Sequence, residues 1–165
     1  MVHLAWEYVD AESNIISAED HIIKPEGFAI SAESTNFHGI EHEEAVSKGK
    51  DLKSVLESFS KLIDEAEHII SFNFTFNSRV FGAECIRKDV SHRLFSSDTY
   101  CLMQETTFYT KLRGRDGRYK WPTLTELFQK VYGQKFADAN RADQDVRATS
   151  MIFFRLLANN VLELD

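Results

Sequence analysis

One acidic residue near the C-terminus, Asp145, combines a reactive side chain with the spacing of a helix. Thr149, Ile152, Phe153 and Leu156 follow it at three- and four-residue steps. On a helix these positions share one face, so the carboxylate would stand at the upper end of a face that packs on the core. A carboxylate in that place can face a cleft as an active-site group. The alternative is a solvated aspartate in the first helical turn, where the helix dipole favours negative charge.

A second candidate is the glycine-containing segment 111–120, KLRGRDGRYK. It gathers five cations beside four aromatic residues, namely Lys111, Arg113, Arg115, Arg118 and Lys120 with Phe108, Tyr109, Tyr119 and Trp121. Cations of this kind bind phosphates and aromatic rings stack on bases, so the segment predicts contact with single-stranded nucleic acid. The alternative is a solvated loop whose aromatic side chains belong to the core.

Two histidines four residues apart, His38 and His42, lie among glutamates and superficially resemble a metal cluster. A helix would be needed to align them, and Gly39 is expected to break it. We therefore interpret this segment as exposed charge rather than as a metal site.

The elements that would position these residues alternate in type along the chain. Alternating apolar residues predict strands over 3–9 and 14–24, which form a hairpin, and short apolar runs predict strands over 68–74 and 98–104. Helices are expected over 32–36, 43–48, 52–66, 77–88, from the T-x-x-E capping box at 123–126 to Gly133, and in the segment ending near 157. An initial antiparallel ribbon followed by alternating strands and helices indicates a mixed α/β fold.

Bulk properties are those of one ordinary globular domain. The chain has 165 residues, of which 43% are hydrophobic and 27% charged, and its net charge of -7 argues against binding nucleic acid by overall charge. Cys85 and Cys101 lack the spacing of a metal site, which favours a reducing compartment. No secretory signal and no membrane-length apolar run is present in this sequence. We expect a soluble, cytoplasmic protein.

Several segments, taken together and in order, resemble the DnaQ-like DEDDh 3'-5' exonucleases, a family with a ribonuclease H-like fold. They are IIKPEGFAI, FHGI, the helix after Asp51, SFNFTFNSRVFGAE, YKWPTLTEL and ANRADQDVRAT. The resemblance implies a mixed sheet flanked by helices. In active members it implies hydrolysis from a free 3' end, with four acidic residues holding two Mg or Mn ions and a histidine accepting a proton from water.

The sequence departs from the family pattern at most of the catalytic positions. The first motif, Asp-x-Glu on the central strand, has no counterpart, so residues 1–165 are interpreted as a single domain that is N-terminally truncated relative to the family. Asn77 stands at the position of an aspartate, and Asn140, after Ala139, stands at the position of the histidine. Asp145 alone keeps the family identity. An amide cannot accept the proton from water near neutral pH.

We therefore expect a degenerate exonuclease-fold protein, catalytically inactive, that acts by nucleic-acid binding or assembly. No cofactor is expected, with Mg or Mn at Asp145 only if residual activity exists. The resemblance places His38, Asn73 and Phe76 at the former substrate cleft, as nucleic-acid contacts alongside the 111–120 loop. The alternatives are an active exonuclease whose first motif lies upstream or is supplied in trans, and a module that binds only proteins.

The missing central strand also has a structural consequence. It would lie between the strand at 3–9 and the strand at 68–74, so these two strands would expose their edges. Either they pair directly in a rearranged sheet, or another strand fills the gap. We expect a homo-oligomer or a strand-donating partner as the source of such a strand, and no contact with a membrane.

Overall fold

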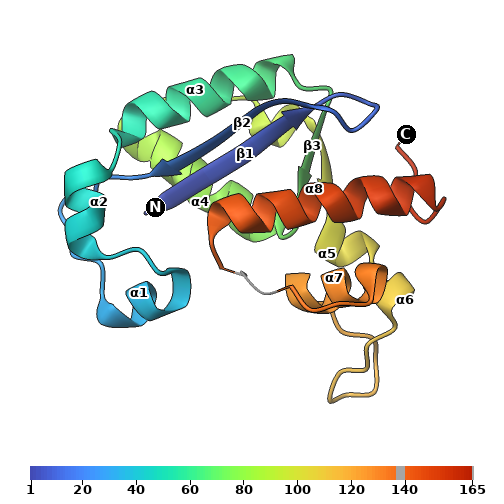
Figure 1. Ribbon diagram of the computed structural model, residues 1–165. Coiled ribbons are helices and arrows are strands. Elements are labelled where there is room, and N and C mark those ends of the chain that lie inside the picture. Colours follow the sequence, from blue (N-terminus) through green and yellow to red (C-terminus); the bar gives the residue numbers. More distant parts are fainter. Residues whose placement is uncertain (137–139, 165) are drawn as a thin grey trace.

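The computed structural model describes residues 1–136 and 140–164 (Figure 1). Its strands are β1 His3–Val9, β2 Ile15–Ile22, β3 His68–Ser71 and β4 Asp98–Cys101. Its helices are α1 Ala32–His38, α2 His42–Lys48, α3 Leu52–Glu65, α4 Phe74–Lys88, the short 3-10 helix Leu94–Ser96, α5 Leu102–Glu105, α6 Thr107–Thr110, α7 Leu124–Tyr132 and α8 Ala142–Ala158. The mixed α/β fold expected from the sequence is confirmed. No helix in the described ranges is long and apolar enough to cross a membrane.

The first sheet is the antiparallel hairpin of β1 and β2. Its register runs from His3 opposite Ile22 to Val9 opposite Ile15, with an irregularity after Tyr8. Because side chains alternate between the two faces of a strand, His3 and Asp20 lie on one face of the hairpin, and Trp6 lies on the other. The hairpin therefore has a face with the polar side chains of His3 and Asp20 and an opposite face with the aromatic side chain of Trp6.

The second sheet pairs β3 and β4 in parallel, with His68 opposite Asp98 and Ser71 opposite Cys101. Helix α4 belongs to the connection between these strands, as the β-α crossover pattern predicts. Within the described residues β1 and β3 do not pair with each other, so the two sheets stay separate. All four residues of β3 are only half-buried, although a parallel strand covered by helices is ordinarily buried. The small sheets fit a ribonuclease H-like core without its central strand.

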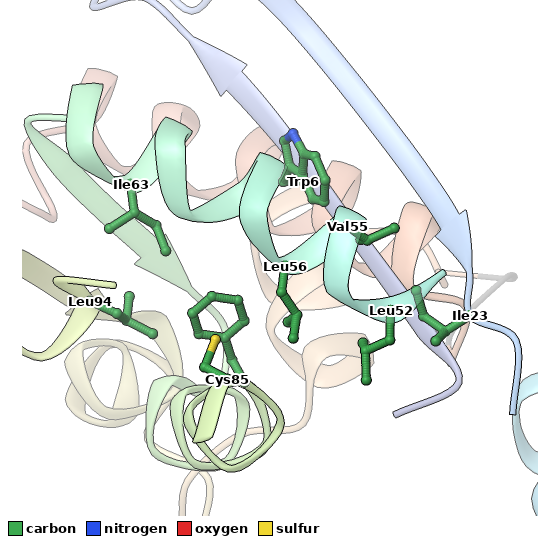
Figure 2. Close-up of a cluster of buried hydrophobic side chains, with 9 residues drawn as sticks. Trp6, Ile23, Leu52, Val55, Leu56, Ile63, Cys85 and Leu94 are labelled. Atoms are coloured by element: carbon green, nitrogen blue, oxygen red, sulfur yellow. The ribbon is translucent and has the colours of Figure 1, made fainter. Parts of the chain in front are cut away.

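The hydrophobic core holds the hairpin between two helices. On one side Trp6 stacks on Phe59 of α3, with ring centroids 5.0 Å apart. Trp6 belongs to the same buried cluster as Val55 and Leu56 of that helix (Figure 2). On the other side α8 packs against β1. A second cluster joins α8 to α7 and α5 through Leu102, Leu127, Ile152 and Leu156. Helix α8 thus belongs to the core and touches both sheets.

Two strands end earlier than the sequence predicts, because a helix begins within the residues expected to be strand. The strand expected over 68–74 ends at Ser71, since Oδ1 of Asn73 accepts the Phe76 N–H at 3.3 Å and caps α4. Helix α4 accordingly begins at Phe74 rather than at residue 77. The strand expected over 98–104 ends at Cys101, where α5 begins. The capping box of Thr123 and Glu126 on α7 is confirmed.

Candidate functional site

The start of α8 carries the first candidate, Asp145. Its Oδ1 accepts the backbone N–H of Asn140 at 3.1 Å, across the turn that precedes the helix. Asn140 has a φ of 82°, a left-handed conformation that asparagine tolerates better than most residues. Below Asp145, the side chains of Ile152 and Leu156 are fully buried. The helix face is therefore arranged as its spacing predicts, with a half-buried carboxylate above an apolar core. Ala139, the other residue of the motif, lies outside the described residues.

Burial raises the pKa of Asp145 above its ordinary value, and the nearby carboxylate of Asp143 raises it further. The Asn140 N–H and His3 oppose this rise. The folded protein thus holds a proton at Asp145 more tightly than the unfolded chain does. This contribution to stability is present at low pH and is lost as the pH rises through the raised native pKa.

Replacing Asp145 by asparagine is therefore expected to stabilise the protein at neutral pH. The amide keeps an oxygen that can accept the Asn140 N–H but carries no charge to bury. With divalent metal removed by a chelator, Tm of Asp145→Asn should exceed that of the wild type by a few degrees at pH 7, and the difference should shrink toward pH 4. Thermal unfolding across this range measures it. A lower Tm for the variant at pH 7 would contradict the prediction.

Next to Asp145 lies a cluster that the sequence did not reveal, formed by His3, Asp20 and Asp143. Their ligand-type atoms all lie within 4.8 Å of one another. His3 Nε2 is hydrogen-bonded to Oδ1 of Asp20, and His3 Nδ1 accepts the N–H of Ala142 at 3.2 Å. The hairpin register places His3 and Asp20 on one face. Nothing in the spacing connects either residue with Asp143.

Asp143 also has two neighbours on its own segment. Its Oδ1 accepts from Arg141 Nε at 3.3 Å, and its Oδ2 accepts from Gln144 Nε2 at 2.7 Å. Burial opposes ionisation of Asp143, but these hydrogen bonds and the Arg141 charge outweigh burial, so its pKa is lowered. Asp143 is therefore ionised at neutral pH.

Among the residues that the family resemblance places at the substrate cleft or at a catalytic position, Asn73 and Asn77 at the start of α4 make hydrogen bonds to nearby residues of the chain. Asn73 caps the helix, and the Asn77 side-chain amide donates to Ser71 Oγ at 2.8 Å. The ring of Phe76 is exposed. Across the part of the chain that is described, no hydrogen bond joins Asn77 to Asn140 or Asp145. These three positions therefore offer one carboxylate and two neutral amides, which do not fit a pair of divalent cations.

His38 lies at the C-terminal end of α1, where its Nδ1 accepts the Ile40 N–H at 3.1 Å. Burial lowers the pKa of His38, and the nearby His3 lowers it further. His42 instead accepts the N–H of Ile30. One ring nitrogen of each histidine thus accepts a backbone N–H. A hollow of about 460 Å³ borders α1, lined by Glu33, Ser34, Asn36, Phe37 and His38.

The 111–120 loop forms a surface platform. Arg113 lies over the Tyr119 ring at 5.8 Å from its centroid, and Phe108 meets the same ring edge-on at 6.0 Å. Phe108 is 74% exposed and Trp121 58% exposed, so the alternative that these aromatics belong to the core is wrong for both. We call Phe108, Arg113 and Tyr119 the aromatic platform.

The cations of the loop differ in how far they are neutralised. Lys120 Nζ contacts Glu126 at 2.6 Å, and Arg118 lies 3.7 Å from Asp116. Within the described residues Arg115 has no ion pair, and Arg113 donates only to the Gly117 carbonyl besides its contact with Tyr119. Among the loop cations of the described residues, Lys111, Arg113 and Arg115 have no ion pair and are therefore the most available to a phosphate.

Comparison with solved structures gives close likeness to exonucleases. The crystal structure of E. coli exonuclease I in complex with a dA16 oligonucleotide has a TM-score of 0.78 at 18% identity, over 97% of this chain and 38% of that chain. A full-length 3'-exonuclease has a TM-score of 0.71 at 16% identity, over 91% of this chain and 50% of that chain.

A further structure concerns 3'-end specific recognition of a histone mRNA stem-loop by a 3'-exonuclease. Its TM-score is 0.70 at 16% identity, over 90% of this chain and 67% of that chain. This chain thus spans well under half the length of exonuclease I. No protein-family model and no curated protein sequence gives a match. The two small sheets and flanking helices of this chain thus share the ribonuclease H-like fold of these exonuclease structures.

Proposed function

We propose that this protein is a single exonuclease-like domain that binds single-stranded nucleic acid and lacks metal-dependent hydrolysis. The observation that carries the proposal is the aromatic platform. Its exposed rings offer faces on which bases can stack, and Arg113 and Arg115 offer cations to the phosphates. A local patch of this kind can act despite the acidic charge of the chain.

The lack of hydrolysis follows from the chemistry at three positions. Asn140 offers an amide where a base would be needed, and its described role is to donate a backbone N–H to Asp145. Asn77 brings no negative charge, and its amide is bound to Ser71. Asp145 alone cannot hold two cations beside a phosphate. We therefore propose that the protein uses no Mg or Mn ion for catalysis, and that the exonuclease fold serves binding.

We further propose that the separate sheets permit assembly. Strands β1 and β3 each pair on one side only among the described residues, and unpaired strand edges accept added strands. A second copy of this chain is the proposed source of such a strand. The two free, buried cysteines are consistent with action in a reducing compartment such as the cytoplasm.

The test uses a short single strand labelled at its 5' end. Fluorescence anisotropy should detect binding that weakens as salt rises, and the strand should stay intact with Mg or Mn. Progressive shortening from the 3' end by pure protein would overturn the claim of inactivity and favour an active exonuclease. Absence of binding at low salt would overturn the binding claim and favour a module that binds only proteins.

A further inference from the structure

We infer that His3, Asp20 and Asp143 form a binding site for one divalent transition-metal ion, of the class of Mn²⁺ or Zn²⁺. The site does not use the positions at which the family resemblance places catalytic ligands. It is also independent of the proposed nucleic-acid binding, because the aromatic platform contributes none of its residues.

The geometry is that of a site built from three separate elements. His3 comes from β1, Asp20 from β2 and Asp143 from the first turn of α8, and their ligand-type atoms lie within 4.8 Å of one another. The His3 side chain is only 5% exposed, so its ring is held in place by packing. The side chains of Asp20 and Asp143 are 44% and 26% exposed, which leaves an approach from solvent.

The local charge favours a cation. Asp20 and Asp143 bring two carboxylates to the cluster. Arg141 provides one opposing charge, 3.3 Å from Asp143, on a side chain that is 43% exposed and able to turn outward. A divalent ion would compensate the remaining negative charge at short range.

The ligand types decide the class of metal. One imidazole nitrogen with two carboxylates suits Zn²⁺ or Mn²⁺, whereas Mg²⁺ strongly prefers oxygen ligands and retained water. Three protein ligands leave open positions on the ion for water. The site should therefore select transition metals over Mg²⁺, unlike a site made of carboxylates alone.

Binding at His3 should also be coupled to the start of α8. Without metal, Nδ1 accepts the Ala142 N–H, so the proton of the neutral ring sits on Nε2, toward Asp20. A metal ion on Nε2 takes the place of that proton, and the neutral ring must carry its proton on Nδ1 instead. Two N–H groups cannot face each other, so the Ala142 N–H must change its partner. The amide of Ala142 is therefore a reporter of metal binding.

The first experiment is a titration of the full chain with Mn²⁺, followed by the EPR signal of the free ion, without nucleic acid. We expect one bound Mn²⁺, displaced by Zn²⁺ and not by equimolar Mg²⁺. Asp20→Asn and Asp143→Asn should each weaken binding roughly 10- to 100-fold. The control Asp116→Asn removes an exposed carboxylate of the 111–120 loop and should bind as the wild type does. No binding by the wild type, or equal binding by all three variants, would overturn the inference.

A second measurement needs no variant and therefore does not depend on how the substitutions fold. In ¹H–¹⁵N spectra of the wild type, Zn²⁺ should shift the amide signals of His3, Asp20 and Ala142 and leave that of Gly114 unchanged. Shifts confined to other residues would overturn the assignment of the site. Since neither experiment contains nucleic acid, their failure and the failure of the proposed function are separate results.

Discussion

Replacing Arg113 and Arg115 together by glutamate is expected to weaken binding to a single-stranded oligonucleotide by about tenfold to a hundredfold. Both residues belong to the loop beside the exposed rings, and Arg113 also lies over Tyr119. Charge reversal removes two phosphate contacts and adds repulsion. The slope of log affinity against log salt should fall in magnitude by about 1.4, since each contact to a single strand accounts for about 0.7. Anisotropy titrations at several salt concentrations measure both quantities.

The matched control reverses two exposed lysines on α3, Lys53 and Lys61, which changes the net charge by the same amount. If binding depends on the platform, the α3 variant should lose much less affinity than the loop variant. Equal losses in the two variants would mean that overall charge, rather than the loop, governs binding. Unchanged affinity of the loop variant would refute the platform as the binding surface.

Truncating Ile152 to alanine is expected to cost about 2–5 kcal/mol in the free energy of unfolding. Ile152 is fully buried on α8 and belongs to the cluster that joins this helix to Leu102 and Leu127. The loss combines the removed apolar contact with the cavity that it leaves. Because domains of this size are typically stable by only about 5–15 kcal/mol, the variant should lose a large part of its stability. Urea denaturation followed by far-UV circular dichroism measures it.

The neighbouring residue provides the comparison. Met151 is 42% exposed, and its backbone carbonyl, which accepts from Tyr132, is kept by the substitution Met151→Ala. That variant should lie within about 1 kcal/mol of the wild type. If Ile152→Ala cost no more than Met151→Ala, the α8 face below Asp145 would not be a core face.

The sequence predicted the ends of helices well where a single side chain, such as a helix cap, determines where the helix begins or ends. The capping box of Thr123 and Glu126 fixed the start of α7 in advance, and its C-terminal Gly133 takes the left-handed conformation. Asn73 shows the opposite case, because it reads equally well as the last part of a strand and as a helix cap. The choice depends on where its side chain finds a donor, which spacing alone does not determine.

The candidate site was only partly predictable for a different reason. Asp145 could be found because its helix repeats at a regular step, and Asn140 because of the motif around it. His3 carried no signal, since a single histidine near the start of a strand has many ordinary roles. Its importance arises from tertiary contact with Asp143, and the Ala142 N–H that it accepts is 139 residues away in the sequence. Pairings at that distance follow from packing rather than from local pattern.

The position of α8 has a consequence for how the chain folds. This helix lies far along the chain from the hairpin, is synthesised after it and covers its His3 face. Until α8 arrives, that face of the hairpin stays exposed, and two isolated strands are only marginally stable in water. Bringing α8 to the hairpin closes a long loop, and the entropy of loop closure is lost before the new contacts stabilise the structure. This order of events slows folding. The hairpin should therefore acquire its native packing only after α8 has been made.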